Sequence, residues 1–347
     1  MNARVAVNGY GVIGKRVADA VALQPDMELA GVADVATDWR IKAVADRLPV
    51  FAATEEAASR MRTAGLRPRG SLDELLEVCD IVIDTTPKHV AAGNLERYRS
   101  AGVKAVFQGG ESHATTGHSF VAQANYESAL GRDTTRVVSC NTTSIVRVLG
   151  ALDTAGLLLR SRGVLIRRAT DPWESHLGGI MNTMVPEPTI PSHQGPDAQT
   201  VLPGLDLVTI AAKGAHTQTH NHFWTLQLTR AAPRDEVVEA LRAAPRIAYV
   251  RMSDGLVALN STLELMRDLG RPRGDMWEVA IWEDLVTVQG DEAFLTYQVY
   301  NEAIVVPETI DAIRALLSLA PDAQTSMAIT DSTLGIRKEF FPSTPQR

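Results

Sequence analysis

The glycine-rich stretch at residues 9–14 constrains the fold more than any other feature of this sequence. It matches the pattern Gly-x-Gly-x-x-Gly, in which the first glycine makes a tight turn, the second lets backbone approach a pyrophosphate and the third lets a helix pack on a strand. The pattern alone is weak evidence, but an apolar run at residues 4–8 precedes it and residues 15–23 have the spacing of an amphipathic helix. We therefore predict a dinucleotide-binding loop that consists of Gly9, Tyr10, Gly11, Val12, Ile13 and Gly14.

Asp34 strengthens this prediction and indicates which cofactor is bound. It ends the second apolar run, about 20 positions after Gly14, where a carboxylate accepts hydrogen bonds from the adenosine ribose. A carboxylate at this position repels the 2′-phosphate of NADP, so the sequence favours NAD. Arg40 and Lys42 lie nearby and keep NADP as the less favoured alternative.

Two kinds of strand pattern predict an α/β protein with two domains. Apolar runs at residues 29–34, 80–85, 104–108 and 136–140 show no polar alternation, as is typical of parallel strands covered by helices on both faces. After residue 152 the expected strands are longer, with fewer helices between them, at residues 164–168, 205–212, 222–228, 279–282, 285–289 and 292–300.

We therefore expect a Rossmann domain with a parallel sheet, formed by residues 1–140 and about 303–347, in which a helix at residues 307–319 returns to the first domain. Residues 141–302 are expected to form an α+β catalytic domain with a mixed or antiparallel sheet. The helical pattern weakens after Ala320, and residues 338–347, which contain two prolines, are interpreted as a loose tail.

Composition narrows the class of partner. The chain has 347 residues, 45% of them hydrophobic and 22% charged, with a net charge of −7, which disfavours nucleic acid and anionic membranes as partners. No apolar run approaches the roughly 20 residues of a membrane span and no basic-then-apolar leader is apparent, so we expect a cytoplasmic protein that binds a small molecule. Two cysteines are too few for a disulfide framework.

Cys140 is the candidate nucleophile. It lies in Ser139-Cys140-Asn141-Thr142-Thr143, between an expected strand and an expected helix at residues 144–152. A helix N-terminus favours the thiolate, and its backbone amides can stabilise an oxyanion. The alternative is that Cys140 is a buried structural cysteine, which its polar neighbours disfavour. We adopt this structural interpretation for Cys79. A cysteine beside a nicotinamide implies attack on an aldehyde, hydride loss and a thioester.

Three histidines, His216, His220 and His222, supply candidates for the base that this chemistry requires. His220 and His222 would share one face of a strand. We assign the base to His220 and interpret His216 and His222 as polar surface residues. A metal site is disfavoured, because no carboxylate or cysteine accompanies the histidines at ligand spacing.

With Gln108-Gly109-Gly110-Glu111, Arg167-Arg168 and the segment at residues 191–197, these motifs resemble the archaeal-type (type II) glyceraldehyde-3-phosphate dehydrogenases, from residue 5 to about residue 319. The resemblance implies oxidation of glyceraldehyde 3-phosphate with NAD(P) and inorganic phosphate to 1,3-bisphosphoglycerate by a homotetramer. It implies that Cys140 is the nucleophile and His220 the base. Further cofactor contacts would come from Thr85, Gln108, Gly109, Gly110 and Asn301, and substrate contacts from Asn141, Thr142, Arg167, His193 and Gln194.

Several residues depart from the family pattern on the substrate side. Gln194 stands where the family usually has a second histidine, Thr217-Gln218-Thr219 replaces a Thr-Thr-Leu-Met run, and Trp173 and Tyr300 lie at other altered positions. The same chemistry on a related anionic aldehyde or acyl phosphate, such as a phosphonate or carboxylate analogue in a biosynthetic pathway, is therefore an alternative. A non-catalytic NAD-binding paralogue is a second one.

Overall fold

The computed structural model describes residues 2–88, 90–108, 110–171, 176, 180 and 182–341. The chain divides into two compact units, which are described separately. The first comprises Met1–Ser139 and Val305–Gly335, and the second comprises Cys140–Ile304 and Ile336–Arg347. The last segment differs from our expectation, which assigned all residues from about 303 onward to the first unit.

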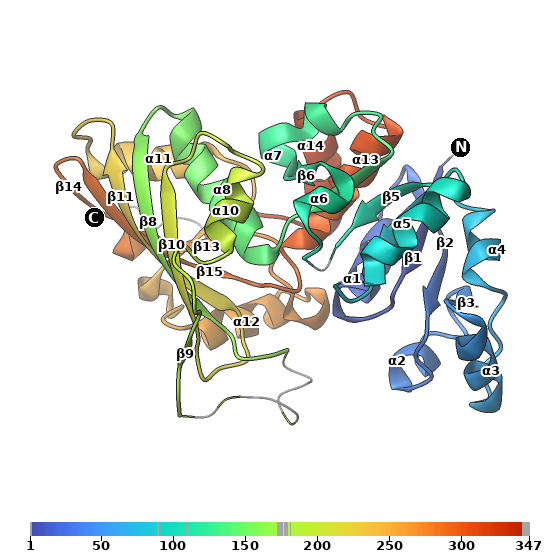
Figure 1. Cartoon of the computed structure of the whole chain (residues 1–347). Coiled ribbons are helices and arrows are strands. Elements are labelled where there is room, and N and C mark those ends of the chain that lie inside the picture. Colours follow the sequence, from blue (N-terminus) through green and yellow to red (C-terminus); the bar gives the residue numbers. More distant parts are fainter. Residues whose placement is uncertain are drawn as a thin grey trace. The chain divides into compact units, whose positions relative to one another are not determined.

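The first unit is built on a parallel sheet whose strand order is β3-β2-β1-β4-β5-β7-β6 (Figure 1). The order reverses at β1, which creates the switch point where Rossmann folds bind their ligands. The predicted α/β class and Rossmann sheet are confirmed. The strands are β1 (Ala3–Asn8), β2 (Met27–Asp34), β3 (Val50–Ala52), β4 (Ile81–Asp84), β5 (Lys104–Phe107), β6 (Ser119–Phe120) and β7 (Thr134–Val137).

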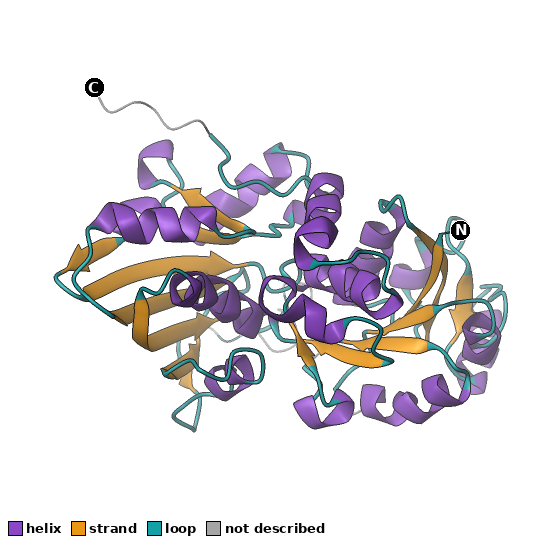
Figure 2. Cartoon of the chain, turned by 90° about the horizontal axis from the view of Figure 1, so that it is seen from above, coloured by secondary structure: helices purple, strands orange, loops and turns teal. Residues whose placement is uncertain are grey.

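Helices cover both faces of this sheet, which explains why its strands are apolar throughout (Figure 2). The central residues Val5–Val7 of β1 and Ile81–Ile83 of β4 are completely buried. The helices are α1 (Val12–Ala22), α2 (Trp39–Lys42), α3 (Glu55–Thr63), α4 (Leu72–Leu76), α5 (Val90–Ser100), α6 (His113–Thr116), α7 (Ala122–Asn125), α13 (Val305–Leu317) and α14 (Ala323–Leu334).

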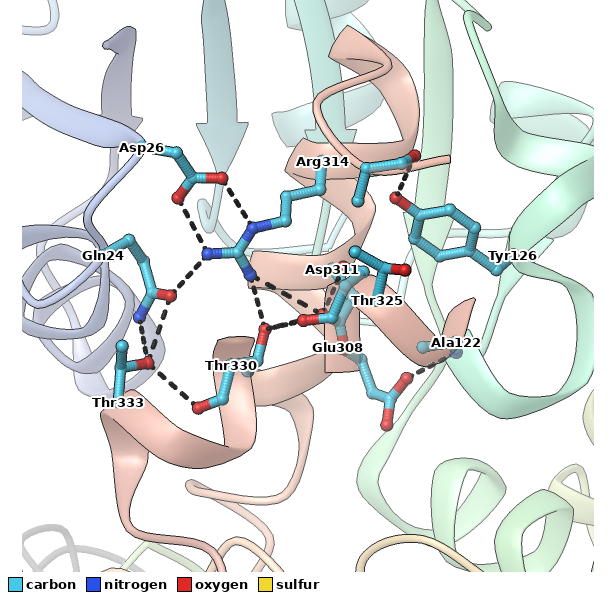
Figure 3. A network of polar contacts seen from close by, with 12 residues as sticks. Gln24, Asp26, Ala122, Tyr126, Glu308, Asp311, Arg314, Thr325, Thr330 and Thr333 are labelled. Carbon is cyan, nitrogen blue, oxygen red and sulfur yellow. Dashed lines mark hydrogen bonds and ion pairs between the residues drawn. The ribbon is translucent and has the colours of Figure 1, made fainter. Parts of the chain in front are cut away.

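A buried polar network holds the returning helix α13 in the first unit (Figure 3). The guanidinium of Arg314 donates through Nε and Nη2 to the carboxylate of Asp26, at 2.8 Å each. It also donates to Gln24 at 2.7 Å and to Thr330 of α14 at 2.6 Å. Arg314 is completely buried, so these acceptors replace the water that its charge loses on folding.

Helix α14 forms where the helical pattern of the sequence weakens, and Lys338 begins the segment that was interpreted as a loose tail. The helix begins at an Asp322 N-cap, whose side chain accepts a hydrogen bond from the Thr325 amide. Beyond it, Lys338 donates through Nζ to the carbonyl groups of Arg242 and Ala243 in the second unit to which it belongs. The sequence pattern did not predict α14, because few of its side chains are apolar and they form no clear helical stripe.

The second unit contains a mixed sheet in the order β12-β13-β15-β11-β8-β10-β9, with β14 paired to β15. The pairs β8–β10 and β12–β13 are parallel and the other pairs antiparallel, as expected for an α+β domain. The strands are β8 (Leu158–Arg167), β9 (Val185–Pro186), β10 (Leu207–Lys213), β11 (His220–Leu228), β12 (Ile247–Val250), β13 (Val279–Trp282), β14 (Thr287–Gln289) and β15 (Glu292–Val299).

Burial alternates along β8 and β11, so the two faces of this sheet differ. The residues that face helix α8 are buried, including His220 and His222, whereas residues on the opposite face are largely exposed. The helices are α8 (Cys140–Thr154), α10 (Gln194–Gln199), α11 (Arg234–Ala243) and α12 (Leu259–Asp268). Within the described ranges, no helix is long and apolar enough to cross a membrane.

We expect Arg314→Met to lower the free energy of unfolding by about 2–3 kcal/mol in urea denaturation. Removing one partner of a buried ion pair costs about 3–5 kcal/mol, and the partly exposed Asp26 regains some hydration. Arg4→Gln, which breaks an exposed pair with Asp80, is the control and should leave the unfolding midpoint unchanged. Equal effects of the two substitutions would contradict a special role for the buried network.

Candidate active site

The glycine-rich loop has the geometry of a phosphate-binding turn. Gly9 has a φ of +95°, which L-residues with a side chain rarely adopt. A Cβ atom on Gly14 would lie 1.8 Å from the Gly9 carbonyl oxygen, so α1 can approach the loop only without a side chain there. A Cβ atom on Gly11 would meet nothing within 4 Å. The space beside Gly11 therefore fits a pyrophosphate.

A cavity of about 580 Å³ in the first unit brings together Gly9, Gly11, Asp34 and Thr85. The Asp34 carboxylate accepts hydrogen bonds from the backbone amides of Tyr10 and Ala36, which fix its position at the end of β2. Each carboxylate oxygen has a further lone pair for a ribose hydroxyl. The donor and acceptor set of this cavity thus fits the adenosine end of a dinucleotide.

Arg40 lines the same cavity, but Asp38 occupies its guanidinium. Arg40 Nε donates to Asp38 Oδ1 at 2.9 Å, and Nη2 donates to Oδ2 at 2.5 Å. The Arg40 guanidinium holds the pKa of Asp38 below its ordinary value. A 2′-phosphate would have to compete with this carboxylate for Arg40.

The other expected cofactor residues take different places. Thr85 donates through Oγ1 to the Gly9 carbonyl at 2.6 Å and so supports the glycine loop. Gln108 ends β5 and donates to Thr309 of α13. Asn301 belongs to the second unit, and its Oδ1 is buried with no partner in the described part of the chain. Tyr10 precedes α1, and Val12 and Ile13 are its first two residues. Gly110 is exposed with a φ of +81°, and Gly109 lies outside the described residues.

Cys140 is the first residue of α8 and is half-buried. The helix begins four residues earlier than the predicted residue 144, so Asn141, Thr142 and Thr143 form its first turn. The thiol therefore lies where the helix amides and the positive end of the helix dipole are available. This arrangement can stabilise an oxyanion that forms beside the sulfur.

The structure contradicts the expected thiolate in the resting chain. Burial raises the pKa of the Cys140 thiol to about 11, although Arg168, Arg167 and the Asn141 amide act in the opposite direction. Glu302 adds to the increase. At neutral pH the thiol is therefore protonated, and its activation requires a proton acceptor or a change in this environment.

His220 occupies the same electrostatic environment. Burial, followed by the charges of Arg168 and Arg167, holds its pKa well below the ordinary value, so the imidazole is neutral at physiological pH. The backbone amide of Arg168 donates to Nδ1 at 3.0 Å. The neutral ring therefore carries its proton on Nε2 in this arrangement. Within the described ranges, no group forms a hydrogen bond with His220 Nε2.

The interpretation of His222 as a surface residue is wrong, because His222 is completely buried. Its Nε2 lies 2.8 Å from Asn141 Oδ1 and its Nδ1 lies 2.9 Å from the Tyr297 hydroxyl. Since the amide oxygen only accepts, Nε2 donates to Asn141 and the tyrosine donates to Nδ1. Burial lowers the pKa of His222 to about 3, so it stays neutral. His222 thereby fixes the side-chain amide next to Cys140. The apolar alternation of β11 was the signal that this residue points inward.

Three residues assigned to the substrate anion converge on a carboxylate of the chain itself. Arg167 forms an ion pair with Glu187 through Nη1 and Oε1. His193 Nδ1 lies 3.3 Å from Glu187 Oε2. The Gln194 amide lies near enough to act on the same carboxylate, although neither amide atom reaches a partner among the described residues. Glu187 was missed from the sequence, because nothing local indicates that it pairs with a residue 20 positions earlier.

Other acidic residues complete this region. Thr142, fully buried, donates through Oγ1 to Asp197 of α10 at 2.8 Å. Arg168 forms ion pairs with Glu302, at 2.8 Å, and with Asp171. Both guanidiniums that act on Cys140 and His220 are thus paired with carboxylates. None of these carboxylates was identified from the sequence.

Two remaining expectations concern residues near the site. His216 is half-buried rather than a surface residue, and its Nε2 has no partner in the described part of the chain. Trp173 lies outside the described residues. Over those same ranges, no group of three or more histidine, cysteine or acidic side chains is placed to hold a metal ion.

Comparison with family models matches each half of the chain. Residues 139–269 match the model described as glyceraldehyde 3-phosphate dehydrogenase, C-terminal domain. Residues 3–142 match the model described as dihydrodipicolinate reductase, N-terminus. Both matches agree with a boundary close to Cys140.

Curated relatives are similar over nearly the whole chain. Proteins named glyceraldehyde-3-phosphate dehydrogenase are 42% identical in Methanococcoides burtonii, covering 96% of this chain and 99% of the relative, and 45% identical in Pyrobaculum calidifontis, covering 97% and 98%. The crystal structure of aspartate semialdehyde dehydrogenase II from Vibrio cholerae is similar with a TM-score of 0.66, covering 92% of this chain and 99% of that one. At 12% identity it shows the shared fold.

We expect the rate of Cys140 alkylation by iodoacetamide to rise about tenfold per pH unit from about pH 7 to about pH 10, because only the thiolate reacts and the pKa lies near 11. Mass spectrometry of the labelled peptide measures this rate. The Cys140→Ser variant reports the background from Cys79, whose thiol pKa burial raises to about 12. A rate that is constant above pH 8 would contradict the protonated resting thiol.

Proposed function

Because this chain belongs to the archaeal-type glyceraldehyde-3-phosphate dehydrogenase family, we propose that it oxidises glyceraldehyde 3-phosphate with NAD and inorganic phosphate to 1,3-bisphosphoglycerate, in a reversible reaction. The observation that carries the proposal is Cys140 at the first position of α8, in the same guanidinium environment as His220. The names of the relatives favour this substrate over a phosphonate or carboxylate analogue, and a non-catalytic role is not favoured.

In the proposed reaction, Cys140 Sγ loses its proton and forms a bond to the aldehyde carbon. The carbonyl oxygen takes up the proton that the thiol lost and becomes the hydroxyl group of a hemithioacetal. NAD, when bound, would supply the acceptor for the hydride on this carbon, and loss of the hydride and the hydroxyl proton would convert the hemithioacetal of Cys140 into a thioester. Phosphate then attacks the thioester carbon, which breaks the carbon–sulfur bond and releases the acyl phosphate and the Cys140 thiol.

His220 has two proposed tasks that use different tautomers. In the tautomer that the Arg168 hydrogen bond requires, Nε2–H can donate to the carbonyl oxygen and stabilise its negative charge after attack. To remove the hemithioacetal proton through Nε2, the ring must instead carry its own proton on Nδ1. The hydrogen bond from the Arg168 backbone amide to Nδ1 must then break. We therefore propose that a tautomer change of His220 accompanies its action as the base. Its low pKa keeps it able to accept a proton at neutral pH.

The side chain of Asn141 is a candidate second donor to the oxyanion. His222 occupies its Oδ1, which leaves the amide nitrogen available. That nitrogen has no partner in the described part of the chain. Thr142, Arg167, His193 and Gln194 are the proposed contacts of the phosphate groups, because guanidinium, imidazole, hydroxyl and amide groups all donate to phosphate oxygens.

NAD rather than NADP is the proposed cofactor. Asp34 lines the cavity and would accept hydrogen bonds from the ribose, and Asp38 pairs with Arg40, which would otherwise be available to a 2′-phosphate. The buried Oδ1 of Asn301 would accept a hydrogen bond from the nicotinamide carboxamide. Pyrophosphate would bind at the glycine loop, next to the α1 N-terminus.

We propose a cytoplasmic homotetramer, as the family resemblance implies. The exposed face of the second unit's sheet supports assembly. Val164, Ile210 and Phe223 are neighbours across β8, β10 and β11, and they are 42%, 46% and 46% exposed. Three adjacent apolar side chains on one sheet face fit a contact with a second copy of the chain.

Cys140→Ser should reduce NADH formation from glyceraldehyde 3-phosphate, NAD and phosphate by more than about 10³-fold, because it removes the nucleophile. Absorbance at 340 nm measures the reaction. Cys79→Ser is the matched control, since Cys79 is a buried residue of the first unit, and it should retain activity. The proposal fails if the unaltered chain turns over no glyceraldehyde 3-phosphate or if Cys140→Ser stays active.

Asp34→Ala should narrow the preference for NAD over NADP by about tenfold or more, because it removes the carboxylate that repels the 2′-phosphate. The ratio of kcat/KM for the two cofactors measures the preference. Glu28→Ala removes the same charge from an exposed position of β2 and should leave the ratio unchanged. An unchanged ratio in Asp34→Ala would show that Asp34 does not face the ribose.

A further inference from the structure

Glu187 occupies the position at which an anion would be recognised. Its carboxylate pairs with Arg167, and both side chains are largely withdrawn from water, with 14% of Glu187 and 24% of Arg167 exposed. The backbone of Glu187 is fixed to β10, because its amide donates to the Ala211 carbonyl at 2.8 Å. The pair therefore connects the end of β8 to the segment that follows β9.

Both carboxylate oxygens of Glu187 face a donor. Arg167 contacts Oε1, and the imidazole of His193 lies 3.3 Å from Oε2. Although burial acts in the opposite direction, Arg167 and His193 hold the pKa of Glu187 below its ordinary value. Glu187 is thus ionised at neutral pH and neutralises the guanidinium charge.

The cluster still has hydrogen-bonding capacity that the chain does not use. Arg167 Nε is buried and has no partner among the described residues. The side chain of Gln194 is completely buried, and both its amide atoms lack a partner over the same ranges. Buried polar groups are normally paired, so these donors are suited to a further acceptor.

We propose that Glu187 determines substrate specificity by competing with the anionic group of the substrate for Arg167. Arg167 and His193 contact the Glu187 carboxylate in the resting chain, and a phosphate must displace that carboxylate to reach them. The unused donors at Arg167 and Gln194 are then available to phosphate oxygens. This inference rests on the proposed function only in taking phosphate as the anion of the substrate.

The competition weakens binding of dianions most. A phosphate dianion that approaches Arg167 meets a guanidinium already neutralised by Glu187, and the displaced carboxylate repels it at short range. An aldehyde with a single negative charge experiences less repulsion. Glu187 thus lowers the affinity for phosphorylated substrates. It thereby reduces the difference in affinity between these substrates and singly charged aldehydes.

The test is Glu187→Gln, which keeps the side-chain shape and removes the charge. Isothermal titration with inorganic phosphate, without aldehyde or cofactor, should show about tenfold tighter binding than the unaltered chain. The KM for glyceraldehyde 3-phosphate should decrease by a similar factor, with kcat within about twofold. Glu187→Gln combined with Arg167→Gln should lose the gain, because the competed-for guanidinium is absent.

Asp206→Asn is the matched control. It removes one negative charge from an exposed ion pair with Arg162 in the same unit and should leave phosphate affinity unchanged. Circular dichroism and the unfolding midpoint establish that the variants fold. Glu187→Asp, which keeps the charge, is a second variant. It should bind phosphate no more than about twofold tighter than the unaltered chain.

Unchanged or weaker phosphate binding by folded Glu187→Gln would overturn the inference, as would an equal gain in Asp206→Asn. Because the titration uses neither aldehyde nor NAD, this outcome is independent of catalysis. Failure of the proposed function would appear separately, as absence of NADH formation by the unaltered chain.

Discussion

The architecture depends on the return of the chain to its first sheet, which the buried pair of Arg314 and Asp26 secures. After β7 the chain leaves the parallel sheet at Cys140 and forms most of the second unit before α13 returns to the first. A buried guanidinium is costly unless its hydrogen bonds are satisfied, and Asp26, Gln24 and Thr330 satisfy those of Arg314. The pairing therefore selects one position for α13 beside the sheet. Cys140 stands at the exit from the sheet, so the fold itself puts it at the beginning of a helix.

Charge at the candidate site is organised by two adjacent arginines. Arg167 is the last residue of β8, and Arg168 follows it directly. Each is paired with its own carboxylates, Glu187 for the first and Glu302 with Asp171 for the second. Burial raises the pKa of Cys140 and lowers that of His220, and the charges of the two arginines oppose the first shift and add to the second. The same charges thus favour the thiolate of one residue and the neutral form of the other.

Local patterns were sufficient for the Rossmann sheet, the mixed second sheet and the glycine loop. Gly9, Gly14 and Asp34 act through their neighbours in sequence, and a motif records such relations directly. Contacts between residues that are far apart in the sequence produce no such local motif. Glu187 was not identified, and neither was the tie between His222 and Asn141, because each requires knowing which strands are adjacent. The thiol pKa of Cys140 also escaped prediction, since it depends on burial.

The two histidines of β11 differ in their hydrogen bonds, which the sequence does not show. The sequence alone distinguishes them only by their order in the chain. His220 and His222 lie on the same face of one strand, both buried and both neutral. Both nitrogens of His222 are engaged by Tyr297 and Asn141, so this ring cannot exchange a proton with a substrate without breaking a buried hydrogen bond. His220 uses only Nδ1. In the tautomer that this hydrogen bond requires, the Nε2–H group of His220 can donate to a substrate oxygen without breaking a buried hydrogen bond. The hydrogen-bond partners, rather than burial or pKa, therefore favour His220 over His222 in the proposed reaction, whereas His222 holds the side chain of Asn141.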